Sequence, residues 1–394
     1  MRLILPIIVV SQFFCTSLWF AGNSIISDMV KDMNLDNGFL AHITSAIQFG
    51  FIIGTLVFAL FTITDRFSPS KVFFFSSILA GLFNLGICLN NMDSTQILLF
   101  RFLTGFFLAG IYPVGMKIAS DYYQTGLGKS LGFLVGALVV GTAFPHLLKN
   151  FITELPWRYV LYSTTFLSFV GGLFVFLLVP NGPYRKAGQK IKLTAFISGF
   201  KNRDFRSYAF GYFGHMWELY TFWAFVPLML SVYNIRSDEA ALNVSLLSFF
   251  VIASGGLACV LSGWLSQYLG AKKLATTSLF ISCSCCILSP IFLYSNSSLL
   301  FLTFLFIWGI SVIADSPLFS TLVAQTAAED SRGTSLTIVN CIGFSITIIS
   351  IQFINWASDK ISGQYLYMIL AIGPILGLVA LLRNKITSPS RDLK

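Results

Sequence analysis

The chain has 394 residues, of which 56% are hydrophobic and only 10% are charged, and its formal net charge at pH 7 is +9. A soluble domain cannot bury so much apolar surface, so the composition excludes a soluble protein and predicts a polytopic membrane protein. The basic residues lie in short segments between apolar stretches, where membrane orientation and contact with anionic lipids explain them. Nucleic acid is therefore excluded as a partner, and membrane lipids are expected.

Twelve apolar stretches follow one another along the chain, and each is close to the roughly 20 residues that a helix needs to cross a bilayer. The first continues past Ala21 without a small-residue cleavage site, so it is interpreted as a retained span and not as a signal peptide. The sequence predicts an all-α integral membrane protein with twelve transmembrane helices, at residues 3–25, 39–62, 72–90, 96–119, 131–152, 159–180, 208–231, 243–266, 273–294, 298–322, 335–356 and 364–382.

A polar segment at residues 181–206 divides these stretches into six and six. Seven of its 26 residues are Lys or Arg, and Asp204 is its one acid. A basic segment between apolar stretches is typical of the cytoplasmic side of a membrane. We predict a six-helix bundle at residues 1–180, a basic cytoplasmic linker at 181–206, and a second six-helix bundle with a short cytoplasmic tail at 207–394.

The distribution of Lys and Arg predicts the orientation. If the amino terminus is cytoplasmic, the inside segments hold 19 of the 25 basic residues, the outside loops hold five, and Arg101 lies inside a span. Cytoplasmic loops carry an excess of Lys and Arg, so both termini are predicted to be cytoplasmic. The expected location is the plasma membrane, which in a bacterium is the inner membrane.

The seven cysteines fall inside apolar stretches and lack the paired spacing of a disulfide framework or a zinc site. They are interpreted as small packing residues, and no metal or other cofactor is expected.

The two halves are related by an internal repeat. Four pairs of positions keep nearly the same offset of 202 to 205 residues: Asp65 with Gln267, Trp19 with Trp223, Pro113 with Pro317, and the GKSL run at Gly128 with the GTSL run at Gly333. One register held over four separated segments indicates a duplicated six-helix unit. Transporters use this kind of symmetry and place their substrate site between the repeats, near the middle of the membrane.

Several motifs resemble the major facilitator superfamily of transporters. The segment Phe61-x-Ile63-x-Asp65-Arg66-x-Ser68-Pro69-Ser70-Lys71 is similar to the family's loop motif G-x-L-x-D-R-x-G-R-K, although both glycines and the second Arg are replaced. The second half retains Gly263, Leu265, Gly270, Lys272 and Lys273 of that motif but has Gln267 in place of the acid. Arg101-x-x-x-Gly105 and Trp157-Arg158-Tyr159 are also similar to family motifs.

The resemblance implies two pseudo-symmetric six-helix bundles that work by alternating access, and a protein that functions as a monomer. It also implies that helices 1, 4, 7 and 10 line a central cavity. Asp65, Arg66 and Lys71 would form a conformational latch that holds the halves together in the outward-open state.

Four ionisable residues lie inside predicted spans: Arg101, His215, Glu218 and Asp315. Each costs about 2.5–3.5 kcal/mol at the centre of a bilayer on insertion scales, so each is expected to have a partner, a wet cavity or a neutral form. All four fall on helices that the resemblance places around the cavity.

His215 and Glu218 are three residues apart, so they share one face of a helix and can touch. We hypothesise that Glu218, assisted by His215, carries a coupling proton; the alternative is a fixed ion pair that stabilises the helix. Asp315 precedes Pro317 by two residues and is a second candidate proton site, a ligand for a cationic group, or the counter-charge of a buried base.

Arg101 stays charged in proteins, so it is expected to need an anion: a carboxylate or phosphate of the substrate, or an acid such as Asp315 or Glu218. Aromatic walls beside polar anchors are typical of small-molecule sites, although the same side chains also serve as packing. The predicted substrate-binding residues are therefore Arg101, Trp19, Asn23, Trp217, Tyr220 and Trp223.

These features predict secondary transport of a small organic solute, with an anionic group met by Arg101 and the proton gradient as the energy source. A proton-driven exporter of drugs or of amphipathic or metal-chelating compounds is the alternative. From other classes, a sensor would bind a ligand without flux, and a membrane-embedded enzyme would alter its substrate chemically. No nucleophile elbow, metal-ligand cluster or phosphate loop supports an enzyme.

Overall fold

The computed structural model describes residues 3–36, 38–123, 127–151, 155–185, 197, 199–328 and 332–383. Throughout these ranges the secondary structure is helical, and none of them contains a β-strand. Twelve of the 26 residues of the predicted linker, 186–196 and 198, lie outside the described residues, and so does the tail from residue 384.

The first half contains ten helical segments. They are α1 (Ile4–Thr16), α2 (Ala21–Ser24), α3 (Ile26–Met33), α4 (Phe39–Leu60), α5 (Ile63–Arg66), α6 (Pro69–Gly86), α7 (Ser94–Leu108), α8 (Tyr112–Tyr122), α9 (Leu127–Phe151) and α10 (Arg158–Leu178).

The second half begins with the longest helix, α12, which has 34 residues. Its helical segments are α12 (Arg203–Arg236), α13 (Val244–Leu269), α14 (Ala271–Phe292), α15 (Ser298–Ala314), α16 (Ser316–Thr326), α17 (Arg332–Ser358), α18 (Gly363–Leu366), the 3₁₀ turn η2 (Tyr367–Ala371) and α19 (Ile372–Arg383).

All twelve apolar stretches that the sequence indicated coincide with helical segments, and nine helices among the described residues are long and apolar enough to cross a membrane. Three of the stretches are broken. The first is interrupted at Ser17–Phe20, the fourth at Ala109–Ile111 and the tenth at Asp315. Pro113 and Pro317 lie in the first turn after the latter two breaks, where the missing amide of proline costs no hydrogen bond.

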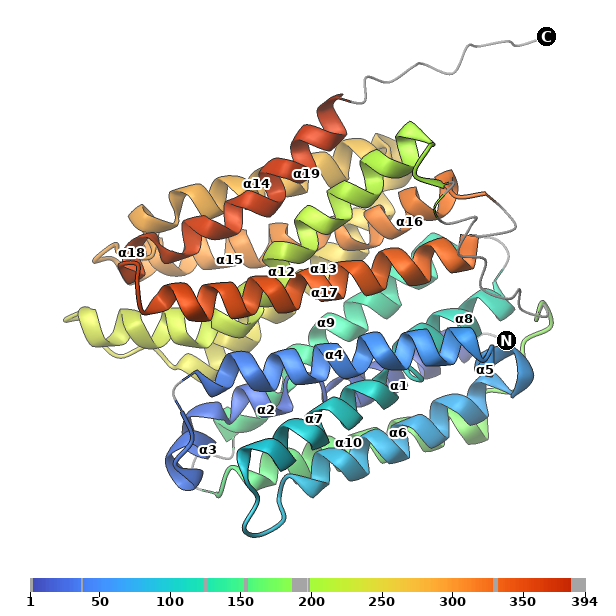
Figure 1. The fold of residues 1–394 in the computed structure, drawn as a ribbon, viewed down its shortest axis with the longest axis horizontal. Coiled ribbons are helices and arrows are strands. Elements are labelled where there is room, and N and C mark those ends of the chain that lie inside the picture. Colours follow the sequence, from blue (N-terminus) through green and yellow to red (C-terminus); the bar gives the residue numbers. More distant parts are fainter. Residues whose placement is uncertain are drawn as a thin grey trace.

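The helices form two groups that lie side by side (Figure 1). In the first group α4 packs on α7, α6 on α10, and α1 on both α9 and α10; in the second α12 packs on α19 and α15 on α13 and α14. The groups meet along two long helix pairs, α9 with α13 and α4 with α17.

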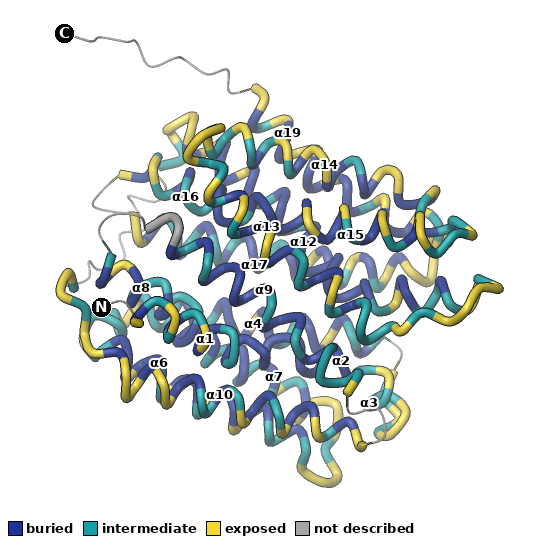
Figure 2. The backbone as a smooth tube through the Cα atoms, turned by 180° about the vertical axis from the view of Figure 1, so that it is seen from behind, coloured by how far each residue is buried: buried dark blue, intermediate teal, exposed yellow. Residues whose placement is uncertain are grey.

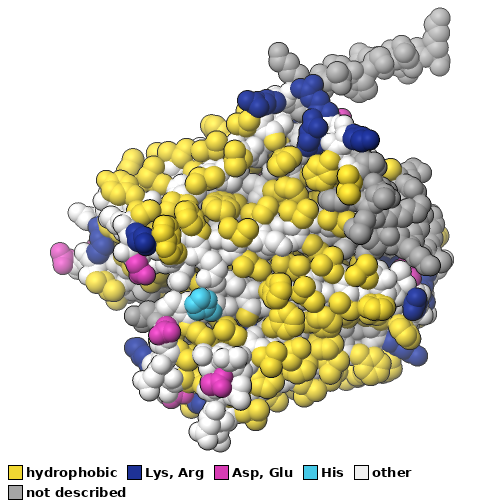
Figure 3. Space-filling view, in the orientation of Figure 1, with side chains coloured by type: hydrophobic (Ala, Val, Ile, Leu, Met, Phe, Trp, Pro, Cys, Tyr) yellow, Lys and Arg dark blue, Asp and Glu magenta, His cyan; other side chains and the backbone are white. Residues whose placement is uncertain are grey.

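Hydrophobic side chains cover the middle of the molecule, and Lys, Arg, Asp and Glu gather at its two ends (Figure 3). Seen from the other side, the backbone tube shows that buried residues line the inward faces of the helices and that exposed ones lie on the outward faces and at the loops (Figure 2). Most of the exposed large side chains on the helices are Phe, Leu and Ile. An apolar belt of this kind is suited to the hydrocarbon core of a bilayer.

The two ends of the molecule differ. We call one the linker side: there Arg185 donates to the carbonyl oxygens of Asp65 and Phe67, and Arg203 donates to that of Arg383 at the end of α19. The start of α1 and the end of α19 lie toward this end in Figure 1. We call the opposite end the far side.

On the far side, polar side chains join the two halves. Asn243 Nδ2 donates to Asn150 Oδ1 at 2.6 Å, and Gln352 Nε2 donates to Ser45 Oγ at 2.8 Å. Gln352 Nε2 also lies 3.4 Å from His42 Nδ1. These contacts close the far side between α9 and α13 and between α4 and α17.

The halves approach most closely where α9 crosses α13 at two glycines. A Cβ atom added at Gly136 would lie 3.0 Å from the carbonyl oxygen of Gly256, and one added at Gly256 would lie 3.1 Å from that of Gly136. Only glycine permits this backbone contact, which is the device that membrane helices commonly use to pack closely.

We expect Gly256→Val to lower the Tm of the purified protein. Its Cβ would lie 2.8 Å from Val140 Cγ2 as well as close to Gly136, and overpacking of this kind costs roughly 1–3 kcal/mol. Gly132→Ala in the same interface is the matched control, because its Cβ would be 3.6 Å from the nearest atom, Cys259 O. Equal Tm values for the two variants would contradict the tight crossing.

Candidate functional site

A cavity of about 790 Å³ lies between the two halves. Its walls come from α4, α8 and α9 on one side and from α12, α16 and α17 on the other. It reaches from Phe51 and Trp223, deep between the halves, to Asp65, Lys117 and Arg332 on the linker side. The described lining includes no residue of α1 or α2, so the implication that helix 1 lines the cavity does not hold in this conformation.

Aromatic side chains from both halves close the deep end of the cavity. Trp19 lies with its ring centroid 4.8 Å from that of Phe51, 5.8 Å from Phe344 and 5.9 Å from Tyr220, and Phe20 lies 6.3 Å from Trp223. We call these six residues the aromatic plug: Trp19, Phe20, Phe51, Tyr220, Trp223 and Phe344. Together with the polar contacts of the far side, the plug leaves the cavity open toward the linker side.

His215 and Asp315 form a buried pair directly behind the cavity wall. His215 Nδ1 lies 2.8 Å from Asp315 Oδ1, and both side chains are almost fully buried. The pair joins α12 to the break between α15 and α16, and the neighbours of each residue in sequence, Met216 and Ser316, line the cavity. Asp315 sits at the amino-terminal end of α16, where the helix dipole favours a negative charge.

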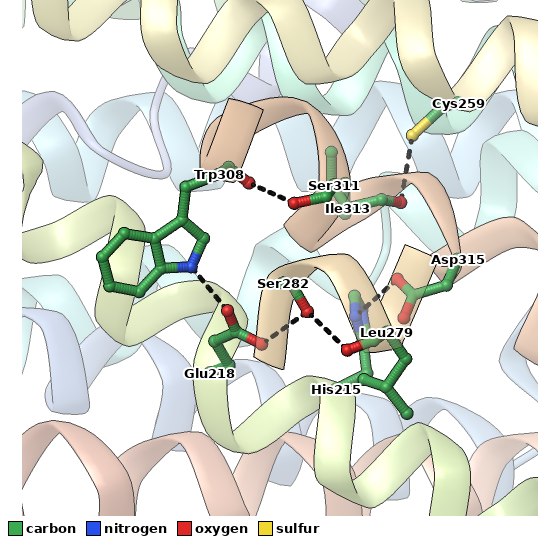
Figure 4. A network of polar contacts seen from close by, with 9 residues as sticks. All are labelled: His215, Glu218, Cys259, Leu279, Ser282, Trp308, Ser311, Ile313 and Asp315. Carbon is green, nitrogen blue, oxygen red and sulfur yellow. Dashed lines mark hydrogen bonds and ion pairs between the residues drawn. The ribbon is translucent and has the colours of Figure 1, made fainter. Parts of the chain in front are cut away.

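Glu218 occupies a separate polar cluster inside the second half (Figure 4). Its carboxylate accepts hydrogen bonds from Trp308 Nε1 at 2.6 Å, Ser282 Oγ at 3.0 Å and Cys286 Sγ at 3.2 Å. The contact that the sequence spacing suggested between His215 and Glu218 is therefore not formed: His215 pairs with Asp315 instead, and Glu218 is held by uncharged donors from α14 and α15.

Arg101 is fully buried in the first half and does not line the cavity. Its guanidinium donates to the carbonyl oxygens of Leu18 at 3.1 Å and Trp19 at 2.5 Å, and to Asn84 Oδ1 at 3.3 Å. Among the described residues, Arg101 is therefore not paired with an acid: main-chain carbonyls freed by the break in the first span and one amide oxygen accept from it, and its Nε has no hydrogen-bond partner. The same geometry does not place Arg101 where it would meet a substrate in the cavity.

The other predicted substrate-binding residues divide into two groups. Tyr220 and Trp223 line the cavity, whereas Trp19, Asn23 and Trp217 are absent from its described lining. Trp19 packs behind the lining as part of the aromatic plug, and Asn23 donates to Thr44 Oγ1 at 2.7 Å. Trp217 donates to the carbonyl oxygen of Ile369 at 3.3 Å and packs between helices of the second half.

The predicted latch residues lie at the mouth of the cavity. Asp65 forms an ion pair of 3.1 Å with Lys117, which is also 3.8 Å from Asp121. Asp65, Lys117 and Asp121 all belong to the first half. The start of α17, from Arg332 to Thr334, forms part of the opposite wall of the cavity. Arg66 and Lys71 are exposed. In this conformation the cluster therefore does not bridge the halves.

Several residues of the cavity were missed by the reasoning from sequence. Tyr112 and Tyr212 lie on opposite walls, and Lys117 stands at the mouth. A tyrosine inside an apolar stretch can serve either packing or hydrogen bonding, and the sequence does not distinguish the two roles. Lys117 was counted only among the basic residues that predict the orientation. Tyr112 does carry one usable signal, since it directly precedes Pro113, a member of the internal repeat.

The sequence model of the Major Facilitator Superfamily matches residues 8–351, with a second match at residues 208–392. The chain belongs to the Major Facilitator Superfamily. Members of this superfamily are secondary transporters and not enzymes, which decides against the membrane-embedded enzyme. The superfamily also accounts for the paired bundles and for the cavity between them.

Two superfamily members illustrate how distant the relatives are. The probable galactarate/D-glucarate transporter GudP of Escherichia coli is 24% identical over 207 residues, which cover 48% of this chain and 44% of that transporter. The match thus spans less than half the length of that curated relative. The crystal structure of the human organic anion transporter MFSD10 superposes with a TM-score of 0.74 over 96% of this chain and 99% of the other, at 11% sequence identity. This likeness is one of fold.

We expect Arg101→Lys to destabilise the protein. A lysine cannot reach the carbonyls of Leu18 and Trp19 in the forked geometry of a guanidinium, and hydrogen bonds to charged groups contribute about 1.5–3 kcal/mol each. The Tm should therefore fall by several degrees. Arg206→Lys, an exposed arginine that donates to the carbonyl of Phe200 at 3.3 Å, is the control and should leave the Tm unchanged. An unchanged Tm for Arg101→Lys would show that the hydrogen bonds of the guanidinium do not stabilise the interruption of the first span.

Proposed function

We propose that this protein carries a small organic solute across the plasma membrane by alternating access, coupled to the movement of protons, and that it works as a monomer. The observation that carries the proposal is the cavity of about 790 Å³, closed at one end by the aromatic plug and backed by the buried His215–Asp315 pair. A cavity open to one side only is what alternating access requires of each end state.

The proposed orientation places the linker side in the cytoplasm. The support is the charge distribution of the sequence, with 19 basic residues in the segments assigned to this side and five in the loops of the other. The structure then corresponds to the inward-open state, in which the Asp65 cluster faces the cavity and leaves α17 unbound. Closure of this side would bring Asp65 and the start of α17 together and open the far side.

The nature of the solute is supported by two similarities. GudP is named a probable galactarate/D-glucarate transporter, and MFSD10 an organic anion transporter. Both handle small organic molecules, and the cavity volume lies within the roughly 300–1,000 Å³ that is usual for sites of this kind.

We propose that the proton is carried by the His215–Asp315 pair. In the charged form an imidazolium and a carboxylate attract each other across 2.8 Å, and loss of the proton to the cavity leaves a neutral imidazole beside the carboxylate. The attraction between α12 and α16 changes with this step. Because α16 supplies Ser316, Ser320 and Thr321 to the cavity wall, protonation and solute binding would act on the same element.

Glu218 is the alternative proton carrier. It accepts hydrogen bonds from Trp308, Ser282 and Cys286, and its neighbour Leu219 also lines the cavity. The pair is preferred because it joins two elements of the cavity wall, α12 and α16, whereas Ser282 and Cys286 lie on α14, which contributes no described residue to the lining.

The test uses proteoliposomes with a pH-sensitive dye inside and a panel of sugar acids, aromatic acids, polyols and aromatic alcohols outside. We expect solute-dependent proton movement in the wild type, loss of at least tenfold in Asp315→Asn and His215→Gln, and retention in Glu218→Gln. The sign of the dye signal reports whether proton and solute move together or in opposite directions, and so separates an importer from an exporter of drugs or chelating compounds.

A second readout guards against misfolded variants. Exchange of labelled solute against unlabelled solute needs no net proton movement, so Asp315→Asn should retain exchange while it loses proton flux. If Glu218→Gln loses proton flux and Asp315→Asn keeps it, the assignment to the pair is wrong. Solute uptake without any proton movement in the wild type would refute coupling altogether.

A further inference from the structure

The cavity presents three tyrosine hydroxyl groups that the protein itself does not use. Tyr112 of α8 lies on one wall, and Tyr212 and Tyr220 of α12 lie on the other. Within the described part of the chain, no hydrogen bond engages any of the three hydroxyls, although all three side chains line the cavity. Most buried polar groups in proteins have a partner, so these hydroxyls are available to a bound molecule.

Trp223 lines the deep end, and its indole Nε1 has no hydrogen-bond partner among the described residues. That atom is itself buried, so the free donors that the cavity offers from both halves are the tyrosine O–H groups. Hydroxyl and amide side chains from α4, α16 and α17 add further uncharged groups: Thr55, Ser316, Ser320, Thr321, Thr337 and Asn340.

Charged side chains are confined to the mouth. Among the described residues that line the cavity, the ionisable acids and bases are Asp65, Lys117 and Arg332. Lys117 is already paired with Asp65 at 3.1 Å, and Arg332 is exposed at the start of α17. Arg101, the buried base of the first half, donates to main-chain carbonyls behind the aromatic plug.

This distribution of charge sets what the deep cavity can hold. A carboxylate or phosphate that left water for this site would lose its hydration without gaining a cation from the described lining, because His215 behind the wall is already paired with Asp315 at 2.8 Å. Such a transfer is strongly unfavourable. An uncharged hydroxyl or carbonyl group exchanges hydrogen bonds with water for hydrogen bonds with tyrosine at little net cost. The site therefore discriminates against anions at the position where binding is deepest.

The remaining walls favour an apolar body. Phe51, Phe344 and Trp223 surround the deep end, and each half contributes one methionine to the lining, Met116 and Met216. Aromatic faces pack well on flat molecules, and methionine adapts its shape to different ligands.

We infer that the transported solute is uncharged when it occupies the cavity: a small molecule with a flat apolar body whose hydroxyl or carbonyl groups bind Tyr112, Tyr212 and Tyr220. The inference rests on the proposed transport function and narrows its substrate class. The inferred substrate class differs from the anions in the names of the two relatives. At 24% and 11% sequence identity, shared binding residues are not expected.

The experiment compares matched probes on the purified full-length protein in lipid nanodiscs, without any gradient. Each set has one ring system, such as naphthalene or indole, that carries a hydroxymethyl, a carboxylate or an aminomethyl group. Equilibrium dialysis at pH 7 measures the Kd of each. We expect the alcohol to bind at least tenfold more tightly than the carboxylate and the ammonium form of the same ring.

Tyrosine variants locate the site. Tyr112→Phe, Tyr212→Phe and Tyr220→Phe should each weaken binding of the alcohol by about three- to tenfold, because each removes one hydroxyl and leaves the ring. Tyr162→Phe, on the exposed face of α10, is the control and should not change the Kd. Thermal unfolding of each variant checks that the fold is retained. Weaker binding at an unchanged Tm is then caused by the missing hydroxyl group and not by unfolding.

The inference is overturned if the carboxylate or the ammonium form binds most tightly, if no alcohol of the panel binds, or if the three tyrosine variants bind as the wild type does. Each of these results leaves the proton-coupling proposal intact, because dialysis involves no proton flux. Conversely, wild-type proteoliposomes that move solute without protons would refute coupling and leave the uncharged substrate class standing.

Discussion

The closed end of the cavity depends on the hydrogen bonds that Arg101 donates to the carbonyls of Leu18 and Trp19. In hydrocarbon, every free backbone carbonyl needs a partner inside the protein, so a span can break only where such a partner exists. The guanidinium supplies it for the first span. The break turns the chain so that Trp19 meets Phe51, Tyr220 and Phe344, and these rings shut the cavity away from the far side.

The two halves use equivalent breaks for different purposes. The fourth span is interrupted at Ala109–Ile111 and the tenth at Asp315, which lies 204 residues after Ile111, the same offset that relates Pro113 to Pro317. In the first half this position carries an apolar side chain that packs in the core. In the second half it carries a carboxylate that reaches His215 on α12. The same position of the repeat is thus a point of packing in the first half and part of a buried His–Asp pair in the second.

The sequence predicts the helices and their pairing better than it predicts the partners of buried charges. Lengths of apolar runs, the internal repeat and the Trp19 and Trp223 pair all correspond to features of the structure. The partner of His215 could not be found in this way, because spacing along α12 places His215 and Glu218 on one face but says nothing of the neighbouring helices. The carbonyl partners of Arg101 could not be found for a related reason: a periodic pattern does not reveal which carbonyls a broken helix leaves free.

Among the described residues, the far-side contacts between the halves join amide and hydroxyl side chains, with His42 next to Gln352, and this affects how the transporter responds to its surroundings. Asn150 with Asn243 and Ser45 with Gln352 join the halves there, whereas the mouth on the linker side carries Asp65, Lys117 and Arg332. Dissolved ions screen interactions between exposed charges but hardly touch hydrogen bonds between amides. Ionic strength on the far side should therefore leave the opening of the far-side closure unaffected. Ionic strength on the linker side should change the interactions at the mouth. The balance between the two end states then responds to the salt concentration of one compartment only.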